Sequence, residues 1–197
     1  PVRYFDLGTG GWKTADSWPP DSTADTWYLD SGGAANSQSG DGRLVETPGR
    51  GPMDSYEYDP ADPVPSCGGR SLMASIQDGG IADQSVVEER EDVLVYTGPR
   101  LTRALSIAGA VTTTLHVSSS APDTDFTAKL VDVEPDGYCV NVAEGILRAR
   151  YRDSRSEPSF IDPGEDIELT VDLGHVAHTF EPGHQIRPSD LGLLKSL

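Results

Sequence analysis

Residues 126–133 read FTAKLVDV, and this stretch decides the fold class. Successive side chains of a β-strand point to opposite faces, so Phe126 and Leu130 would share one face while Val131 would lie on the other. Both faces of the stretch are therefore partly apolar, which is typical of a strand that is covered on each side. The stretch predicts an inner strand in a protein built from packed β-sheets.

Six further segments carry a strand signal, because they are short and rich in β-branched or aromatic residues. Clusters of Gly, Pro, Asp and Ser separate them, as turns require. No window of a dozen residues shows a convincing helical period. Residues 1–197 are therefore predicted to form one all-β domain, an antiparallel β-sandwich. The six segments are VRYFDL (2–7), TWYL (26–29), DVLVYT (92–97), AVTTTLHVSS (110–119), GILRARYR (145–152) and DIELTVDL (166–173).

The charge balance excludes two classes of partner. The chain of 197 residues has 15 Lys and Arg against 32 Asp and Glu, which gives a net charge of −17. Nucleic acids and anionic membranes bind clustered Lys and Arg, so neither is expected as a partner. No apolar run approaches the roughly 18 residues that a membrane span needs. The chain starts at Pro1 without a leader, so we expect a fragment of a longer protein; its cellular location stays unknown, with the cytoplasm favoured.

Residues 26–33 read TWYLDSGG, and the Asp-Ser-Gly-Gly within them resembles the surroundings of the nucleophile in many chymotrypsin-like proteases. A serine nucleophile needs a histidine base, an orienting carboxylate and an oxyanion hole. No histidine precedes Ser31, and the G-x-S-x-G elbow occurs nowhere in the chain. We therefore expect Ser31 to lie in a turn and predict no catalytic residue. An autonomous hydrolase that uses Ser31 is the alternative.

Three histidines near the C-terminus suggest a zinc site at first sight. His175 and His178 are three residues apart, whereas zinc-binding helices place histidines four residues apart. On a strand the odd spacing sends the two rings to opposite faces, and His184 is expected to fix a turn by hydrogen bonding to backbone. The aspartates of 121–126 and 133–137 are expected to be solvated turn carboxylates or caps at strand ends, with calcium as the alternative. We assign no metal and no cofactor.

The two cysteines, Cys67 and Cys139, are far apart in the sequence and match no metal spacing. Unpaired cysteines are among the most buried residue types. We expect two free, mostly buried thiols, and a single disulfide is the alternative.

The segment 145–152 would place three arginines on one face of a strand. Arg148, Arg150 and Arg152 alternate with Leu147, Ala149 and Tyr151. One interpretation is ion pairing with neighbouring acidic strands. The other is a face on which a second domain docks, and we take Arg148, Arg150 and Arg152 as the candidate docking face.

A longer comparison of motifs points to a family. The run 110–152, AVTTTLHVSSSAPDTDFTAKLVDVEPDGYCVNVAEGILRARYR, resembles the C-terminal domain of the X-Pro dipeptidyl-peptidase and cocaine-esterase-like (CocE/NonD) serine hydrolases. VRYFDLGTGGWKTADSWPP, YEYDPADPVPSCGG and HTFEPGHQIR agree with it. The resemblance implies a jelly-roll β-sandwich of the galactose-binding-like type that follows an α/β-hydrolase domain. It also implies that the Ser-His-Asp triad lies upstream of this chain.

Residues 188–197, PSDLGLLKSL, depart from the family pattern. Pro188 cannot donate a hydrogen bond to a sheet, so a closing strand is expected to be truncated or replaced. An unpaired sheet edge would follow, and such edges favour self-association, so a homodimer is possible.

Three functions follow from these observations. The first is a non-catalytic domain that packs on the α/β-hydrolase domain of the same polypeptide, for stability and for formation of a pocket or a dimer. The second is a carbohydrate-binding module with Trp12 and Trp18 as an aromatic surface. The third is the autonomous hydrolase centred on Ser31. We favour the first, with an exposed apolar patch beside Arg148 as its expected signature.

Overall fold

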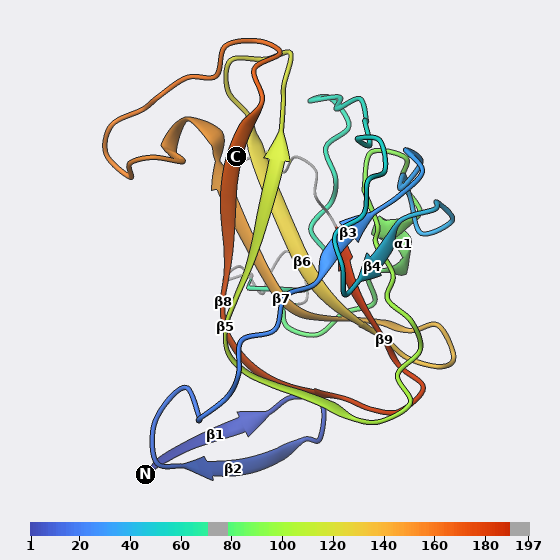
Figure 1. Cartoon of the computed structure of the whole chain (residues 1–197), viewed down its shortest axis with the longest axis vertical. Coiled ribbons are helices and arrows are strands. Elements are labelled where there is room, and N and C mark those ends of the chain that lie inside the picture. The colour runs from blue at the N-terminus through green and yellow to red at the C-terminus, as the bar shows by residue number, and fades with distance from the viewer. Residues whose placement is uncertain (71–78, 190–197) are drawn as a thin grey trace.

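A computed structural model describes residues 1–70 and 79–189 of the chain. Its centre is a β-sandwich of two antiparallel sheets (Figure 1). One sheet pairs β5 (Leu105–Val117) with β8 (Ile167–Phe180). The other has the order β7-β6-β9, with β7 (Cys139–Arg148), β6 (Asp125–Val133) and β9 (Gln185–Ser189). The expected all-β sandwich is confirmed.

Strand β6 is the middle strand of its sheet, and all nine of its residues are buried. Phe126 and Leu130 lie in the main hydrophobic core, whereas Val131 and Val133 form a separate cluster with Cys139. A bulge between Leu130 and Val131 shifts the register with β7 at this point. The prediction of an inner strand with cover on both faces is therefore confirmed.

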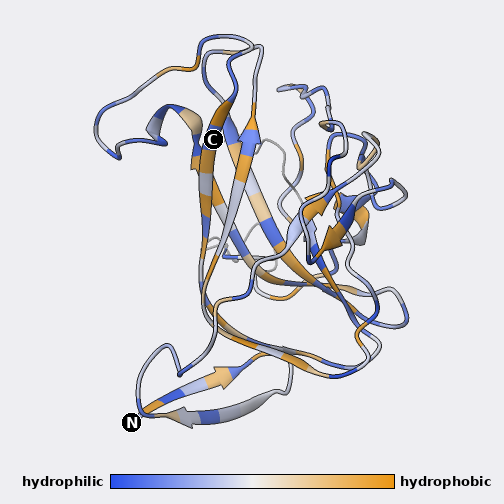
Figure 2. Ribbon diagram, in the orientation of Figure 1, coloured by the Kyte–Doolittle hydropathy of each residue, from blue (hydrophilic) through white to orange (hydrophobic). Residues whose placement is uncertain are grey.

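The main core lies between the two sheets, because each contributes one apolar face to it. In β8 the residues Leu169, Val171 and Leu173 are buried while the alternate positions are exposed. Each fully buried aliphatic side chain contributes about 1.5–3 kcal/mol relative to exposure. Figure 2 shows the apolar residues concentrated along these strands and the hydrophilic ones in the peripheral loops.

Smaller elements surround the sandwich. A hairpin of β1 (Val2–Asp6) and β2 (Gly11–Ala15) lies at one end, where the N-terminus is (Figure 1). A second pair consists of β3 (Tyr28–Asp30) and β4 (Arg43–Val45), and a single helical turn, α1 (Ser85–Glu88), lies nearby. In the described residues, no helix is long and apolar enough to cross a membrane.

Two strand predictions were wrong. Strand β7 ends at Arg148, and residues Ala149–Tyr151 form a 3-10 helix, so 145–152 is not one strand. The backbone N–H groups of Ala149 and Arg150 bond to Thr124 and Asp123, which turns the chain away from the sheet. Residues 92–97 begin in a turn and form only isolated bridges, one of them between Val95 and Ser189 of β9.

The expectation of an unpaired sheet edge near Pro188 was also wrong. Strand β9 pairs with β6 on one side, where Pro188 lies opposite Leu130. On its other side the N–H groups of Tyr96 and Gly98 donate to the carbonyls of Pro188 and Ile186. Pro188 therefore accepts a hydrogen bond where it cannot donate one, and this edge is covered. Residues 190–197, on which the rest of that expectation falls, lie outside the described residues.

Candidate functional site

Ser31 lies in a buried turn rather than in a catalytic arrangement. Its hydroxyl donates to Asp54 Oδ2 at 2.6 Å and accepts from the backbone N–H of Gly33 at 3.1 Å. The same carboxylate accepts from Tyr96 at 2.7 Å and from the N–H of Ala35 at 2.8 Å. Burial, and then the hydrogen bond to Asp54 and the charge of that carboxylate, raise the pKa of Tyr96 well above its usual range. None of the described hydrogen bonds of Ser31 goes to a histidine, so the Asp-Ser-Gly-Gly motif forms a structural turn.

His175 and His178 occupy opposite environments on β8, as their spacing predicts. His175 is exposed and accepts a hydrogen bond from Trp18 Nε1 at 2.9 Å. His178 is buried and lies 2.8 Å from Asp132 Oδ2, and His184 lies 2.9 Å from the other oxygen of the same carboxylate. The prediction that the His184 ring forms a hydrogen bond to the backbone is therefore wrong. This pairing joins β6 to β8 and to the turn before β9.

The aspartates considered for calcium have protein partners. Arg148 donates to Asp123 and to Asp125, both at 2.8 Å. Arg150 lies 3.4 Å from the carboxylate of Asp123. In the part of the chain that the structure describes, no three His, Cys, Asp or Glu side chains are grouped to hold a metal ion.

The predicted arginine face has a different geometry from the one expected. Because 149–151 is a 3-10 helix, Arg148, Arg150 and Arg152 do not share one strand face. Hydrogen bonding to Asp123 and the charge of Asp125 raise the pKa of Arg148 despite its burial. Arg152 donates to the carbonyls of Ala149 and Ser159. These arginines thus hold the loop after β7, and their docking role stays a prediction.

Trp12 and Trp18 belong to opposite faces of the β1–β2 hairpin. Trp12 lies opposite Phe5 in the register and is 64% exposed. Trp18 packs on Tyr4, with ring centroids 5.2 Å apart, on the side that faces β8. The two indoles therefore do not form one platform, which is what stacking on a sugar ring requires.

A carboxylate on the inner face anchors this hairpin to the sandwich. Asp6 is 1% exposed and accepts hydrogen bonds from Lys13 Nζ at 2.6 Å, Thr179 Oγ1 at 2.7 Å and the N–H of Thr9 at 3.0 Å. Burial alone would raise the pKa of Asp6, but these bonds outweigh it and hold the pKa well below its usual range. The N–H of Leu7 adds a bond to the carbonyl of Ala177. We call this arrangement the Asp6 anchor.

A buried ion pair between α1 and β9 was not predicted from the sequence. Arg187 of β9 donates to Glu88 at 2.6 Å and to Thr97 at 2.9 Å, and the Glu88 side chain is only 1% exposed. Both cysteines are free thiols, as expected. Burial, and then the charge of Glu88, raise the pKa of Cys139 to about 12. The partners are distant in sequence, so only the fold brings them together.

Comparison with known proteins places this architecture in a family. The profile of the X-Pro dipeptidyl-peptidase C-terminal non-catalytic domain matches residues 1–188. The chain belongs to this family. The cocaine esterase of Rhodococcus sp. (strain MB1 Bresler) is 45% identical over 187 residues, which are 94% of this chain and 32% of the esterase. The resemblance to the cocaine-esterase-like hydrolases is therefore confirmed.

Two solved structures share the fold over nearly the whole domain. An α-amino acid ester hydrolase superimposes with a TM-score of 0.84 at 30% identity, over 100% of this chain and 34% of that one. An aminopeptidase from a marine sediment Thaumarchaeota archaeon gives a TM-score of 0.79 at 27% identity, over 99% and 33%. The chain thus spans about a third of the length of these relatives. It corresponds to the C-terminal non-catalytic domain that defines the family, and the carbohydrate-binding alternative is not supported.

Proposed function

We propose that this domain packs on an α/β-hydrolase domain of the same polypeptide and stabilises that catalytic domain. The observation that carries the proposal is the family match over residues 1–188, combined with coverage of only 32% of the cocaine esterase. The relatives are named for ester and peptide substrates. We therefore propose ester or amide hydrolysis by a serine nucleophile in the preceding domain.

The chain itself supplies structure in this proposal. Ser31 is bonded to Asp54, and each of the four histidines has a described partner other than Ser31. The docking face at Arg148, Arg150 and Arg152 and a homodimer remain proposals. The arginines could serve a partner through the exposed parts of their guanidinium groups, since Arg148 and Arg150 retain about a third of their side-chain surface.

An ester-hydrolysis assay tests the proposal on two proteins, this chain and the full-length polypeptide that contains it. The full-length protein should turn over ester substrate, and replacement of the serine in its G-x-S-x-G elbow should abolish turnover. This chain should show none. Turnover by the chain alone that disappears in Ser31→Ala would contradict the proposal.

Calorimetry of the full-length protein tests the packing. Domains joined by a substantial interface should unfold in coupled transitions, whereas domains without one unfold independently. Two transitions that remain unchanged when either domain is destabilised by mutation would contradict the proposed packing.

A further inference from the structure

The outward face of the β1–β2 hairpin carries an exposed cluster of Arg3, Phe5 and Trp12, which we call the hairpin patch. The rings of Phe5 and Trp12 meet edge to face with centroids 5.5 Å apart. The guanidinium of Arg3 lies 5.0 Å from the centroid of the Trp12 ring. Phe5 is 41% and Trp12 64% exposed. Tryptophan and arginine are enriched among the residues that dominate binding energy at protein interfaces, so the patch has the composition of an interface centre.

The hairpin does not serve the core of the domain. In the described part of the chain, none of the residues in the three hydrophobic clusters comes from residues 1–15. An isolated two-stranded hairpin is marginally stable in water. This one is nevertheless fixed to β8 by the Asp6 anchor. The hairpin is thus held firmly, contributes no residue to the described hydrophobic clusters and exposes two aromatic rings. These features suit a surface that binds another domain or protein.

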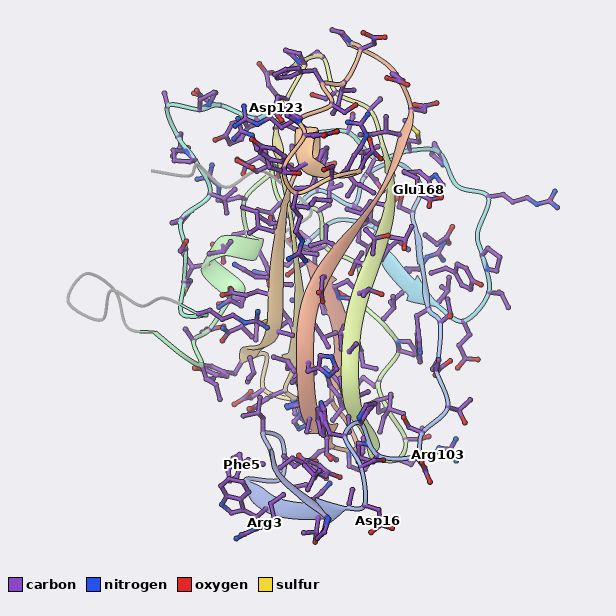
Figure 3. The ribbon with its side chains drawn as sticks, turned by 90° about the vertical axis from the view of Figure 1, so that its left-hand side faces the viewer. Arg3, Phe5, Asp16, Arg103, Asp123 and Glu168 are labelled. Carbon is purple, nitrogen blue, oxygen red and sulfur yellow. The ribbon has the colours of Figure 1, made fainter. Side chains whose placement is uncertain are left out.

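Resting on the proposed function, we propose that the hairpin patch is the surface on which the α/β-hydrolase domain of the same polypeptide docks. The family is defined as a C-terminal domain, and its match to this chain begins with the hairpin. The preceding domain of such a polypeptide connects to β1. Figure 3 shows Arg3 and Phe5 at the outer end of the molecule, beyond the sandwich strands. The patch is thus next to the point where the preceding domain joins.

The competing surface lies at the other end. Asp123, the partner of Arg148, is at the end of the molecule opposite Arg3 and Phe5 (Figure 3). Two exposed apolar residues flank the arginines in sequence there, Ile146 at 53% and Phe160 at 59% exposure. The arginines at that end already bind acidic or carbonyl groups of the domain itself. In the described residues, Arg3 makes its contact with the face of Trp12 and none with an acid.

Hydroxyl-radical footprinting of the full-length polypeptide distinguishes the two ends. Trp12 and Phe160 are oxidised readily when they are open to water, and Met53, which is 68% exposed, serves as an internal reference. If the hydrolase domain covers the hairpin patch, Trp12 should be oxidised roughly tenfold more slowly than its exposure in this domain predicts, because interface centres exclude water. Phe160 and Met53 should keep the reactivity of exposed side chains.

Each other outcome overturns the inference. A reactive Trp12 with a protected Phe160 would place the docking surface at the arginine end and leave the proposed packing intact. Reactive Trp12 and Phe160, together with uncoupled unfolding in the calorimeter, would contradict both the inference and the proposed function. Protection of Trp12 that disappears on dilution would assign the patch to a second copy of the protein.

Matched variants of the full-length protein give a second readout. Trp12→Ala should increase the population in which the two domains are separated by roughly 30-fold, the equivalent of a 2 kcal/mol interface contribution. This population is measured by cleavage of the exposed domain boundary with a limiting amount of protease. Phe160→Ala removes a similarly exposed aromatic ring and should leave cleavage unchanged. Equal cleavage of both variants would overturn the inference.

Discussion

Replacing Asp6 with Asn should release the hairpin from the sandwich without unfolding the domain. The amide oxygen of Asn can still accept from the N–H of Thr9, which bonds to Oδ1 in the native protein. The amide NH2 would replace Oδ2, which accepts from both Lys13 and Thr179. An ammonium group cannot accept a hydrogen bond, so the Lys13 contact changes from attraction to repulsion.

The bonds determine the expected magnitude. Hydrogen bonds to a charged group contribute about 1.5–3 kcal/mol when buried. The Lys13 side chain is 38% exposed, so its share is screened and closer to about 1 kcal/mol. Together with the Thr179 bond, we expect a total loss of about 2.5–4 kcal/mol in the free energy of hairpin opening, which is roughly a 60- to 700-fold increase in the open population.

Hydrogen exchange measures this population at the amide of Leu7, which donates to the carbonyl of Ala177. Exchange at Leu7 should accelerate by that factor in Asp6→Asn, while amides in β6 should be unaffected because opening is local. Asp16→Asn, the same change at an exposed position just after β2, is the matched control. If Asp6→Asn changes the Leu7 rate by less than about threefold, equivalent to roughly 0.6 kcal/mol, the account of the anchor is wrong.

The anchor should also depend on pH in a defined direction. The pKa of Asp6 is lower in the folded state than the value near 3.9 of an unfolded aspartate. Its contribution to stability is therefore fully present above about pH 4 and is lost as the pH falls below that value toward the folded pKa. Exchange at Leu7 should accelerate beyond the intrinsic pH trend in this acidic range. The Asp6→Asn variant should lack the additional acceleration.

Three further predictions concern buried groups. Glu88→Ala leaves Arg187 buried without its carboxylate and should lower the free energy of unfolding by about 3–5 kcal/mol in urea titrations; a loss under about 1 kcal/mol would contradict this. Ser31→Ala removes a structural hydrogen bond and should cost about 1–2 kcal/mol, while esterase activity per folded full-length molecule stays unchanged. Cys139 should be alkylated at pH 8 far more slowly than the partly exposed Cys67, since its pKa is raised to about 12, and equal rates would refute that assignment.

Local patterns found at least part of β5, β6, β7 and β8 but not β9. Alternation in 126–133 identified β6 as an inner strand, and the motif series of 110–152 identified the family. Strand β9 was missed because Pro188 argues against a strand, and only the donor from Tyr96 shows why the proline fits. The odd spacing of His175 and His178 was informative because the strand period is short and local.

The candidate sites depended on contacts that local patterns do not contain. The alternating arginines of 145–152 fitted a strand, but Asp123 binds the backbone of Arg150 and ends the strand before it. The binding of His178 and His184 to one carboxylate joins residues 46 and 52 positions away from Asp132. Such tertiary partners override propensity, and their identity follows from the packed fold alone.

The two faces of the hairpin depart from the usual polarity of a surface strand pair, which buries its apolar face and exposes its polar one. Here the inner face carries buried Asp6 and half-buried Lys13 beside half-buried Tyr4, and the exposed face carries Phe5 and Trp12. The charged anchor adds to the contact of Tyr4 with Trp18 in holding the hairpin, and cover by a second domain would give the aromatic face a function. Asp6→Asn should therefore also reduce the protection of Trp12 in the full-length protein, although Asp6 lies on the face away from the proposed partner.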